Sequence, residues 1–462
     1  PIMNNILKKT AVAALATIML GSCNIYKKYE TPDQTALTKA YKEAREMQDD
    51  STAFGNLRWE SVFTDPMLAD LINRALENNT SLANARLNVS IAQAQLKGAR
   101  LAYLPSVVLA PNGAGASYAG SDFSWTYQIP AQVSWEIDIF GKLLNSKRGA
   151  QAQLLQSEDY AQAVRSQIIS AVANTYYGIA ALKAQLELSR ETANIWAENV
   201  QAMKDYKLAG RVTEAAVVQS AANYYNILGS ITDLEVSLDQ LNNTMSLLVN
   251  ELPQQWNIQA DALEHFSAPD MVRAGVPMAE LASRPDVAAA EQSLAVAYYA
   301  TNSARAAFYP GLSITANGGF TNLLGSMVKN PGDWFVQLAG SLVAPLFSRG
   351  QNIARLEAAK AQQQQAMNNF EYTLMSAAAE VSDAMTVYAK STEKATYLVD
   401  QVDNLQKSVS ITNDLLKYYN GTYLEVLTAQ SSLLSAQMSQ IGCQLNRTQA
   451  IVNLYQALGG GR

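Results

Sequence analysis

The chain is poor in charged residues, in cysteine and in histidine, and it has no long hydrophobic segment. Asp, Glu, Lys and Arg make up 16% of its 462 residues, against roughly 25% in a typical soluble domain. Two cysteines are too few for a disulfide scaffold, and one histidine, His265, argues against a histidine-based metal centre. The longest apolar run, residues 11–21, is shorter than the roughly 20 residues of a transmembrane helix. These absences exclude a polytopic helical membrane protein and a small disulfide-rich domain.

The balance of charge excludes a further class of protein. The 34 Lys and Arg residues against 40 Asp and Glu residues give a net charge of −6, whereas nucleic-acid binders normally carry a basic excess. No nucleophile motif, phosphate-binding loop or metal-ligand spacing stands out, so we expect no catalytic residue, no cofactor, no metal site and no nucleic-acid partner. Glu136 and Asp138 could form an acid–base pair, but their place at the end of a predicted strand favours charges at its rim.

The N-terminus is typical of a bacterial lipoprotein signal. Two lysines precede an apolar run at residues 11–20, and small residues then lead to Cys23, as in a signal peptide. The sequence Leu-Gly-Ser-Cys that ends there resembles the lipobox, in which the cysteine thiol carries the lipid. We therefore expect residues 1–22 to be a signal peptide and residues 23–56 a lipidated tail. The alternative is an ordinary secretory signal with an incidental cysteine.

The body of the chain reads as two copies of one pattern. Residues 100–109 resemble residues 305–314, and further pairs of segments match at offsets between 205 and 211. Such self-similarity indicates an internal duplication. We predict a first repeat at 57–255, a linker at 256–278, where Pro and Gly accumulate, and a second repeat at 279–458.

Each repeat contains two segments in which apolar and small polar residues alternate. From Trp125 to Ile137 every second residue is apolar and the residues between are mostly Ser, Thr and Gln, which predicts strand pairs at about 104–138 and 310–346. Their length and terminal aromatic residues are typical of strands that cross an outer membrane. Four strands cannot close a barrel, and a bilayer tolerates no open sheet edge. Several chains would therefore share one barrel, of eight strands in a dimer or twelve in a trimer.

In the sequence, long helices precede and follow these strands. A helix is predicted at residues 66–102, and apolar residues spaced alternately three and four apart predict helical hairpins at about 142–250 and 348–457. Each hairpin turns at a glycine, Gly210 or Gly421. Such hairpins bury too little surface alone. They form either a coiled-coil rod or, joined to membrane strands, a tube of helices that continues a barrel.

Five short motifs occur in order along the chain, at residues 26–32, 59–79, 134–142, 284–310 and 344–350. Together they resemble the TolC-like outer membrane factors, the outer membrane efflux protein family, and in particular the lipoprotein branch of multidrug efflux systems of the RND (resistance-nodulation-division) type. The resemblance implies a mainly α-helical chain with a membrane β part. Three chains would form a twelve-stranded β-barrel that continues into a long periplasmic α-helical coiled-coil barrel, and the protein would transport without catalysis.

The same resemblance implies partners and sites. A homotrimer in outer-membrane lipid would meet a periplasmic adaptor (membrane fusion) protein and an inner-membrane transporter, of RND type. The residues that would contact the adaptor lie at the hairpin tips: Gly210, Arg211, Gly421 and Thr422. The periplasmic gate would involve Glu425 and Thr428, where family members often carry two carboxylates, so the threonine departs from the pattern. A charge that stabilises a helix N-terminus explains Glu425 equally well.

The function that follows is a passive exit duct in the outer membrane of a Gram-negative bacterium. It would conduct drugs or other small molecules out of a tripartite pump. Two alternatives stay open at this point. One is the outer-membrane duct of a type I protein secretion system, and the other is a lipid-anchored periplasmic coiled-coil scaffold.

Overall fold

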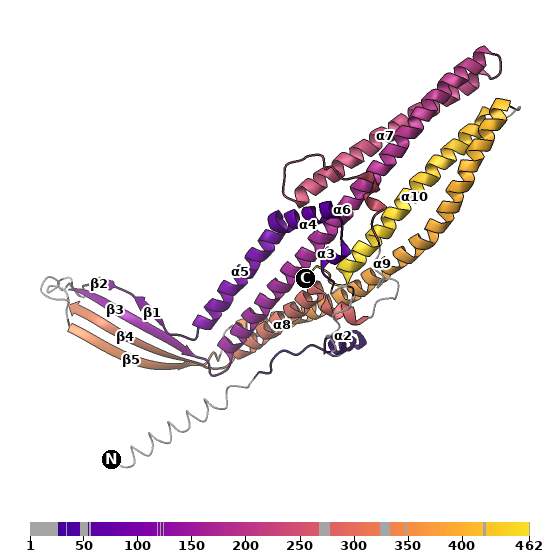
Figure 1. The fold of residues 1–462 in the computed structure, drawn as a ribbon. Coiled ribbons are helices and arrows are strands. Elements are labelled where there is room, and N and C mark those ends of the chain that lie inside the picture. Colours follow the sequence, from indigo (N-terminus) through magenta and orange to yellow (C-terminus); the bar gives the residue numbers. More distant parts are fainter. Residues whose placement is uncertain are drawn as a thin grey trace. The chain divides into compact units, whose positions relative to one another are not determined.

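The computed structural model divides into two compact units, which are described separately below. Figure 1 shows the fold and the element labels. The first unit comprises residues 1–32, 87–158 and 288–372, and the second comprises residues 33–86, 159–287 and 373–462. The structure describes residues 26–33, 35–46, 54, 57–117, 119–120, 122, 124–267, 278–323, 333–346, 349–418 and 422–461. Each unit draws on both predicted repeats.

The first unit contains one antiparallel sheet in the order β1/β2, β3, β4, β5 (Figure 1). The strands are β1 (Ser106–Leu109), β2 (Asn112–Ala116), β3 (Ser124–Ile137), β4 (Gly311–Leu323) and β5 (Asp333–Val343). Both β1 and β2 pair with β3, so they are two halves of the first predicted strand. The break between them contains Pro111 and lies opposite Pro130 of β3. A proline has no N–H to donate, so the hydrogen-bond ladder is interrupted here.

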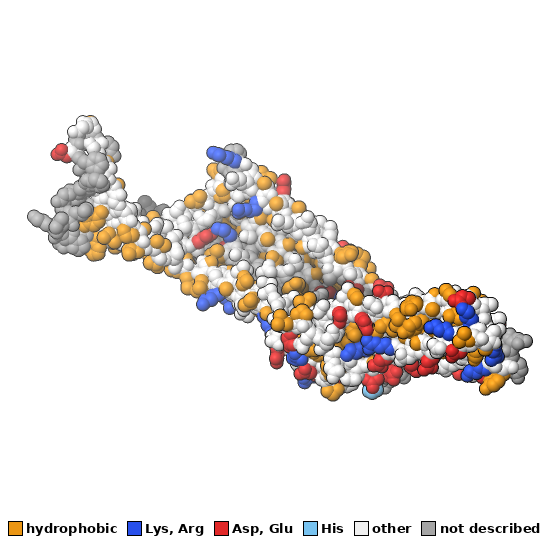
Figure 2. Space-filling view, turned by 90° about the horizontal axis from the view of Figure 1, so that it is seen from above, with side chains coloured by type: hydrophobic (Ala, Val, Ile, Leu, Met, Phe, Trp, Pro, Cys, Tyr) orange, Lys and Arg blue, Asp and Glu red, His pale blue; other side chains and the backbone are white. Residues whose placement is uncertain are grey.

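The register gives the sheet one apolar and one polar face. Val133 pairs with Val107 and Ala316, whereas the next residue, Ser134, pairs with Thr315. Six apolar side chains of the sheet are each at least 66% exposed: Val107, Leu109, Trp334, Val336, Leu338 and Leu342. Figure 2 shows almost only hydrophobic and uncharged side chains over the sheet, while Lys, Arg, Asp and Glu gather over the hairpins. The alternation of apolar and polar residues in the sequence thus corresponds to the apolar and the polar face of the sheet.

Both edges of the sheet are open within the chain. Among the described residues β1 and β2 pair only with β3, and β5 pairs only with β4. Unpaired backbone N–H and C=O groups at a sheet edge can accept a strand from another chain. Of the helices that the structure describes, none combines the length and apolar character needed to cross a membrane.

Strands β3 and β4 approach each other closely where Pro130 lies opposite Gly319. A Cβ atom on Gly319 would collide with the carbonyl oxygen of Ile129 and would lie 2.8 Å from the Cα of Pro130. Both obstacles are backbone atoms and cannot rotate away. The strand pairing therefore requires glycine at this position.

The two hairpins have matching lengths. In the first, α6 (Lys142–Leu208) has 67 residues and α7 (Glu214–Leu248) has 35. In the second, α9 (Gln351–Tyr418) has 68 residues and α10 (Tyr423–Ala457) has 35. At about 1.5 Å per residue, each long helix extends about 100 Å. This near-identity of lengths is the structural form of the predicted duplication.

Shorter helices complete the chain. They are α2 (Ala36–Glu46), α3 (Trp59–Val62), α4 (Pro66–Asn78), α5 (Thr80–Leu101), α8 (Pro285–Ala306) and the 3₁₀ helices η3 (Ala260–Leu263) and η5 (Met278–Ser283). The expected single helix over residues 66–102 is wrong, because α4 and α5 are separated at Asn79. The Asn79 side-chain amide donates to the carbonyl of Leu248 at 2.9 Å, and its oxygen accepts from the N–H of Ser81 at 2.9 Å. This cap ends one helix and starts the next.

The hydrophobic core of the second unit forms where α4 packs against α6, α7 and α10. Asp65 caps α4 by accepting from the backbone N–H groups of Met67 and Leu68 at 2.8 and 3.1 Å. The buried hydroxyl of Tyr176 donates to the other Asp65 oxygen at 2.8 Å. Burial, with Asp65 beside it, holds the pKa of Tyr176 far above its usual value. The motif around residues 59–79 thus serves packing and helix capping.

Candidate functional site

The tip of the first hairpin is a glycine-terminated helix end. Gly210 has a φ of +70°, a conformation that glycine adopts without strain. It allows the N–H of Arg211 to donate to the carbonyl of Tyr206 at 2.8 Å, as in a Schellman-type C-cap. The exposed guanidinium of Arg211 lies over the Tyr206 ring, 5.2 Å from its centre. The turn thus needs the glycine, while the arginine is the group that a partner can reach.

The tip of the second hairpin is organised by Glu425. Its carboxylate accepts from the backbone N–H of Thr422 at 3.2 Å, which is one half of a capping box at the start of α10. The hydroxyl of Thr428 donates to the carbonyl of Leu424, one turn back in the same helix, at 2.8 Å. The side chains of Glu425 and Thr428 are exposed. Gly421 lies outside the described residues.

The structure brings the two hairpin tips together, which the sequence analysis did not predict. Met203 and Val217 of the first hairpin form a buried cluster with Tyr423 and Leu427 of the second. Burial raises the pKa of the Tyr423 hydroxyl. The described residues of the two tips therefore belong to one surface rather than to two separate ones. The one hint of this contact in the sequence is the apolar residues that follow Thr422 directly, at the start of α10.

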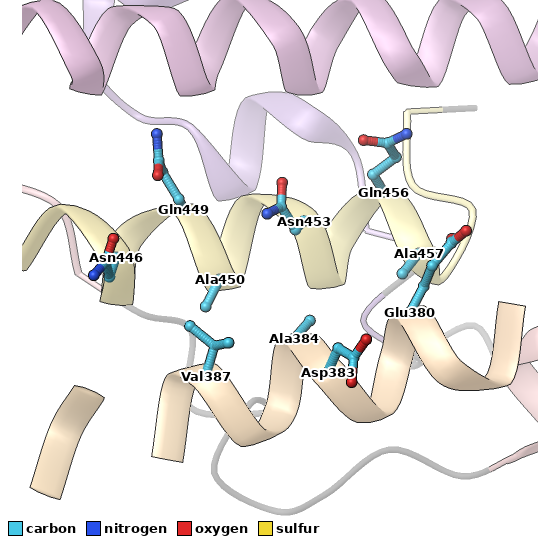
Figure 3. A pocket seen from close by; sticks show the side chains of 10 residues that line it. All are labelled: Glu380, Asp383, Ala384, Val387, Asn446, Gln449, Ala450, Asn453, Gln456 and Ala457. Carbon is cyan, nitrogen blue, oxygen red and sulfur yellow. The ribbon is translucent and has the colours of Figure 1, made fainter. Parts of the chain in front are cut away.

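A polar hollow of about 420 Å³ lies along α9 and α10 (Figure 3). Its apolar floor contains Ala384, Val387 and Ala450, which lie between the two helices (Figure 3). The remaining lining residues are polar or acidic apart from Ala457: Glu380, Asp383, Asn446, Gln449, Asn453 and Gln456. Within the part of the chain that the structure describes, no group of three or more His, Cys, Asp and Glu side chains is placed to hold a metal ion.

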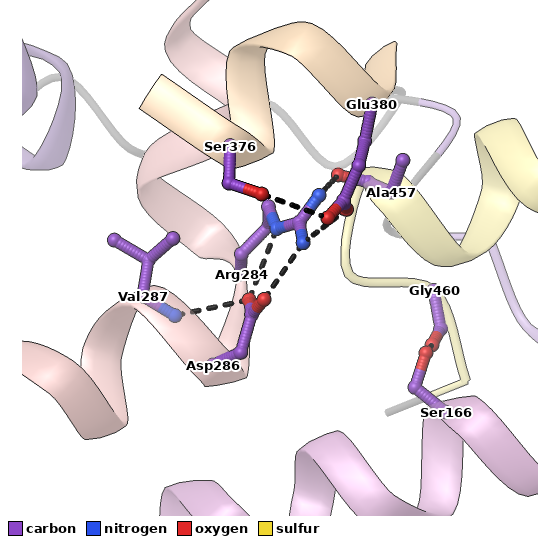
Figure 4. Close-up of polar contacts among 8 residues, drawn as sticks. All are labelled: Ser166, Arg284, Asp286, Val287, Ser376, Glu380, Ala457 and Gly460. Carbon is purple, nitrogen blue, oxygen red and sulfur yellow. Dashed lines mark hydrogen bonds and ion pairs between the residues drawn. The ribbon is translucent and has the colours of Figure 1, made fainter. Parts of the chain in front are cut away.

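At one end of this hollow, Arg284 lies where the start of α8 meets α9 and the end of α10 (Figure 4). The side chain is only 5% exposed. It donates to the carbonyl of Ala457 at 2.8 Å, to both oxygens of Asp286 at 3.0 and 2.7 Å, and to Glu380 at 2.7 Å. Burial by itself lowers the pKa of Arg284, but its hydrogen bonds and charge interactions with Asp286 and Glu380 raise it above the usual value. The motif at residue 284 therefore pins the start of α8 to α9 and to the end of α10.

In the first unit, the N-terminal segment of residues 26–32 lies on α6 and α8. The Tyr29 N–H donates to the Tyr299 hydroxyl at 3.0 Å, and the Thr31 hydroxyl donates to Glu291 at 2.5 Å. The ring of Tyr26 packs at Gly141, just before α6 begins. Cys23 lies outside the described residues, and its lipidation stays a prediction.

The two carboxylates at the end of β3 have structural partners. Glu136 forms an ion pair with Lys142 at 2.8 Å. Asp138 accepts from the backbone N–H of Leu144 at 2.7 Å, which caps the first turn of α6. The arrangement fixes the junction between strand and helix, and each carboxylate is used in that junction.

A two-faced, open-edged sheet joined to two long helical hairpins of equal length defines a channel protein of the outer membrane rather than an enzyme. The sequence profile of the Outer membrane efflux protein family matches residues 71–251 and 276–460. The chain therefore belongs to the outer membrane efflux protein family.

The chain is also similar in sequence to individual efflux proteins. The cation efflux system protein CusC of Escherichia coli O6:H1 is 27% identical over 453 residues, which cover 96% of this chain and 97% of CusC. The toluene efflux pump outer membrane protein TtgC of Pseudomonas putida is 29% identical over 478 residues, 97% of this chain and 94% of TtgC.

Solved structures of outer-membrane channels have the same fold. The open state of the MtrE outer membrane channel of Neisseria gonorrhoeae aligns with a TM-score of 0.81 at 26% identity, over 95% of this chain and 98% of MtrE. A CusC structure aligns with a TM-score of 0.81 at 25% identity, over 95% of this chain and 100% of CusC.

These findings confirm several expectations from the sequence. The chain is mainly helical with four strands in a duplicated unit, and it is an outer-membrane efflux channel without catalytic chemistry. The domain boundaries, the contact residues at the tips, the gate and the lipidated cysteine stay predictions.

Proposed function

We propose that three copies of the chain form one duct that passively conducts drugs or other small molecules to the cell exterior. An inner-membrane transporter of RND type delivers the molecules, and a periplasmic adaptor joins it to the hairpin tips around Gly210, Arg211, Gly421 and Thr422. Three sheets of four strands each complete a twelve-stranded barrel, whose polar face lines the lumen. CusC and TtgC are named for the efflux of cations and of toluene, which favours small cargo over the secretion of polypeptides.

The observation that carries this proposal is the exposed apolar face of the sheet. Leu338 and Val336 are 74% and 72% exposed within one chain, which would cost free energy in water and none in lipid. The unpaired edges at β1/β2 and β5 are acceptable in a bilayer only when other chains pair with them. A lipid-anchored scaffold would need neither feature.

Conductance of the purified protein in planar lipid bilayers tests the proposal. We expect discrete, cation-preferring channels, and crosslinked species of three times the mass of the mature chain. A monomer that gives no channels at any protein concentration would contradict the duct and support the scaffold.

The gate is tested by two substitutions at Glu425. If three Glu425 carboxylates narrow the lumen, both Glu425→Ala and Glu425→Gln remove a ring of negative charge, so basal conductance rises and cation preference falls. If Glu425 only caps α10, glutamine retains the acceptor for the Thr422 N–H and conducts as the wild type does. Equal conductance of the wild type and the glutamine variant would therefore overturn the gate.

The lipid anchor is tested by replacing each cysteine in turn. We expect Cys23→Ala to abolish incorporation of labelled palmitate, because the thiol is the attachment atom, while the channel still inserts through its sheet. Cys443→Ala is the matched control, since Cys443 is buried in α10 and 3% exposed. Labelling that survives Cys23→Ala would show that Cys23 is not the acceptor.

A further inference from the structure

All connections between helices and strands lie at one end of the sheet, and this end is strongly basic. The register pairs Ser106 with Ser134 and Gly311 with Val343, so the ends of α5 and α8 and the starts of α6 and α9 adjoin the same sheet end. Residues 97–105, 135–149, 305–312 and 343–355 together hold eight basic and two acidic residues. The basic residues are Lys97, Arg100, Lys142, Lys147, Arg148, Arg305, Arg349 and Arg355.

At the opposite end of the sheet, the described residues carry no such charge. The described residues between 112 and 127, together with residues 320–323 and 333–334, include no Lys or Arg. At the basic end, Glu136 forms an ion pair with Lys142, and Asp138 accepts a hydrogen bond from the Leu144 N–H. With both carboxylates counted, this end of the sheet still carries an excess of six positive charges.

Two of the cations lie beside the aromatic residues at this end of the sheet. Trp135 lies two residues after Val133 and therefore on the same, apolar face of β3. Its indole N–H donates to the carbonyl of Tyr103 at 2.9 Å. The ammonium of Lys147 lies 5.8 Å from the centre of the Tyr103 ring. Arg100 of α5 reaches Gln151 at 3.5 Å, and Gln151 follows Lys147 by one turn of α6.

The surroundings of Arg100 and Lys147 are amphiphilic. Both cations are exposed, and neither forms an ion pair with a carboxylate of the described residues. Beside them, Leu101, Leu104 and Val107 are 51%, 61% and 68% exposed. Two cations, an aromatic pair and exposed apolar side chains thus occur together at this end of the sheet.

We infer that Arg100 and Lys147 bind the phosphate of an anionic glycerophospholipid whose acyl chains lie on the apolar face of the sheet. The inference rests on the proposed insertion of the sheet in a membrane. Tyr and Trp favour the boundary between lipid and water, and basic side chains at that boundary attract anionic headgroups. Tyr26 packs at the same end of the sheet and lies three residues after Cys23. Three residues span at most about 11 Å, so a lipid on Cys23 would enter the membrane within that distance of Tyr26.

Titration of the delipidated, full-length protein in detergent with phosphatidylglycerol or phosphatidylcholine, followed by native mass spectrometry, tests the site. We expect the wild type to prefer phosphatidylglycerol, and Arg100→Gln with Lys147→Gln to weaken its binding by about fivefold for each charge removed. The double variant Lys204→Gln with Lys394→Gln removes the same charge from exposed positions on α6 and α9, far along each helix from the sheet, and should bind as the wild type does.

Three outcomes would overturn the inference. They are equal binding of the two lipids, equal binding by the wild type and the Arg100/Lys147 variant, and displacement of phosphatidylglycerol by millimolar inorganic phosphate, which would indicate a site for a free anion. Bilayer conductance of the same preparations separates this test from that of the proposed function. Channels without lipid preference would refute only the lipid site, whereas lipid preference without channels would refute the duct.

Discussion

The substitution Gly319→Val is expected to prevent the sheet from assembling, with a loss of about 3 kcal/mol or more in the stability of the folded chain. The Cβ of any residue here meets backbone atoms of Ile129 and Pro130, so β3 and β4 must separate. Valine itself favours strands, and the loss would therefore come from the collision alone. The measurement is the fraction of protein that reaches the outer membrane and resists SDS before heating.

Gly340→Val is the matched control for this prediction. Gly340 lies in β5 opposite Ile314, and a Cβ there meets nothing within 4 Å. It should insert as well as the wild type. Equal insertion of the two variants would show that the close approach at Gly319 is not needed for the sheet.

Arg284→Ala is expected to lower the free energy of unfolding by about 1–3 kcal/mol, because the buried Ala457 carbonyl is left without a donor, whereas Asp286 and Glu380 are 43% and 52% exposed and become hydrated. The carbonyl of Ala457 loses its donor, and Asp286 and Glu380 lose their shared cation. Urea unfolding followed by the helical circular dichroism signal measures the change.

Two further variants sharpen this result. Arg284→Lys should restore only part of the stability, since an ammonium cannot reproduce the fork of the guanidinium. Arg58→Ala removes an exposed arginine that pairs with Glu60 at 2.9 Å, and it should change the unfolding midpoint little. A midpoint for Arg284→Ala equal to that of Arg58→Ala would mean that the buried network does not hold the helices together.

The regular parts of the fold could be predicted because their periodicity is strong. Alternation from Trp125 to Ile137 located β3 within a residue, and the heptad spacing with glycine turns located both hairpins. The break at Asn79 was missed because the helical pattern continues across it. The bond to Leu248 that sets the break comes from a residue 169 positions away, and no local pattern contains it.

The candidate sites were less accessible to sequence reasoning for the same physical reason. The capping role of Glu425 could be predicted, since Thr422 precedes it by the spacing of a capping box. The cluster of Met203, Val217 and Tyr423 depends on two hairpins meeting. Likewise, Arg284 stands out in a motif, but only the packed helices show that it holds Glu380 and the end of α10.

The docking of residues 26–32 has a consequence for the order of events during biogenesis. Tyr29 and its partner Tyr299 are 270 positions apart, so this contact cannot form until α8 has been synthesised and folded. Residues 26–32 thus stay undocked while the chain is synthesised from α6 to α8. Closure of the segment onto α6 and α8 needs the chain only as far as α8, so the N-terminal segment can be in place before β4 and β5 add the second half of the sheet.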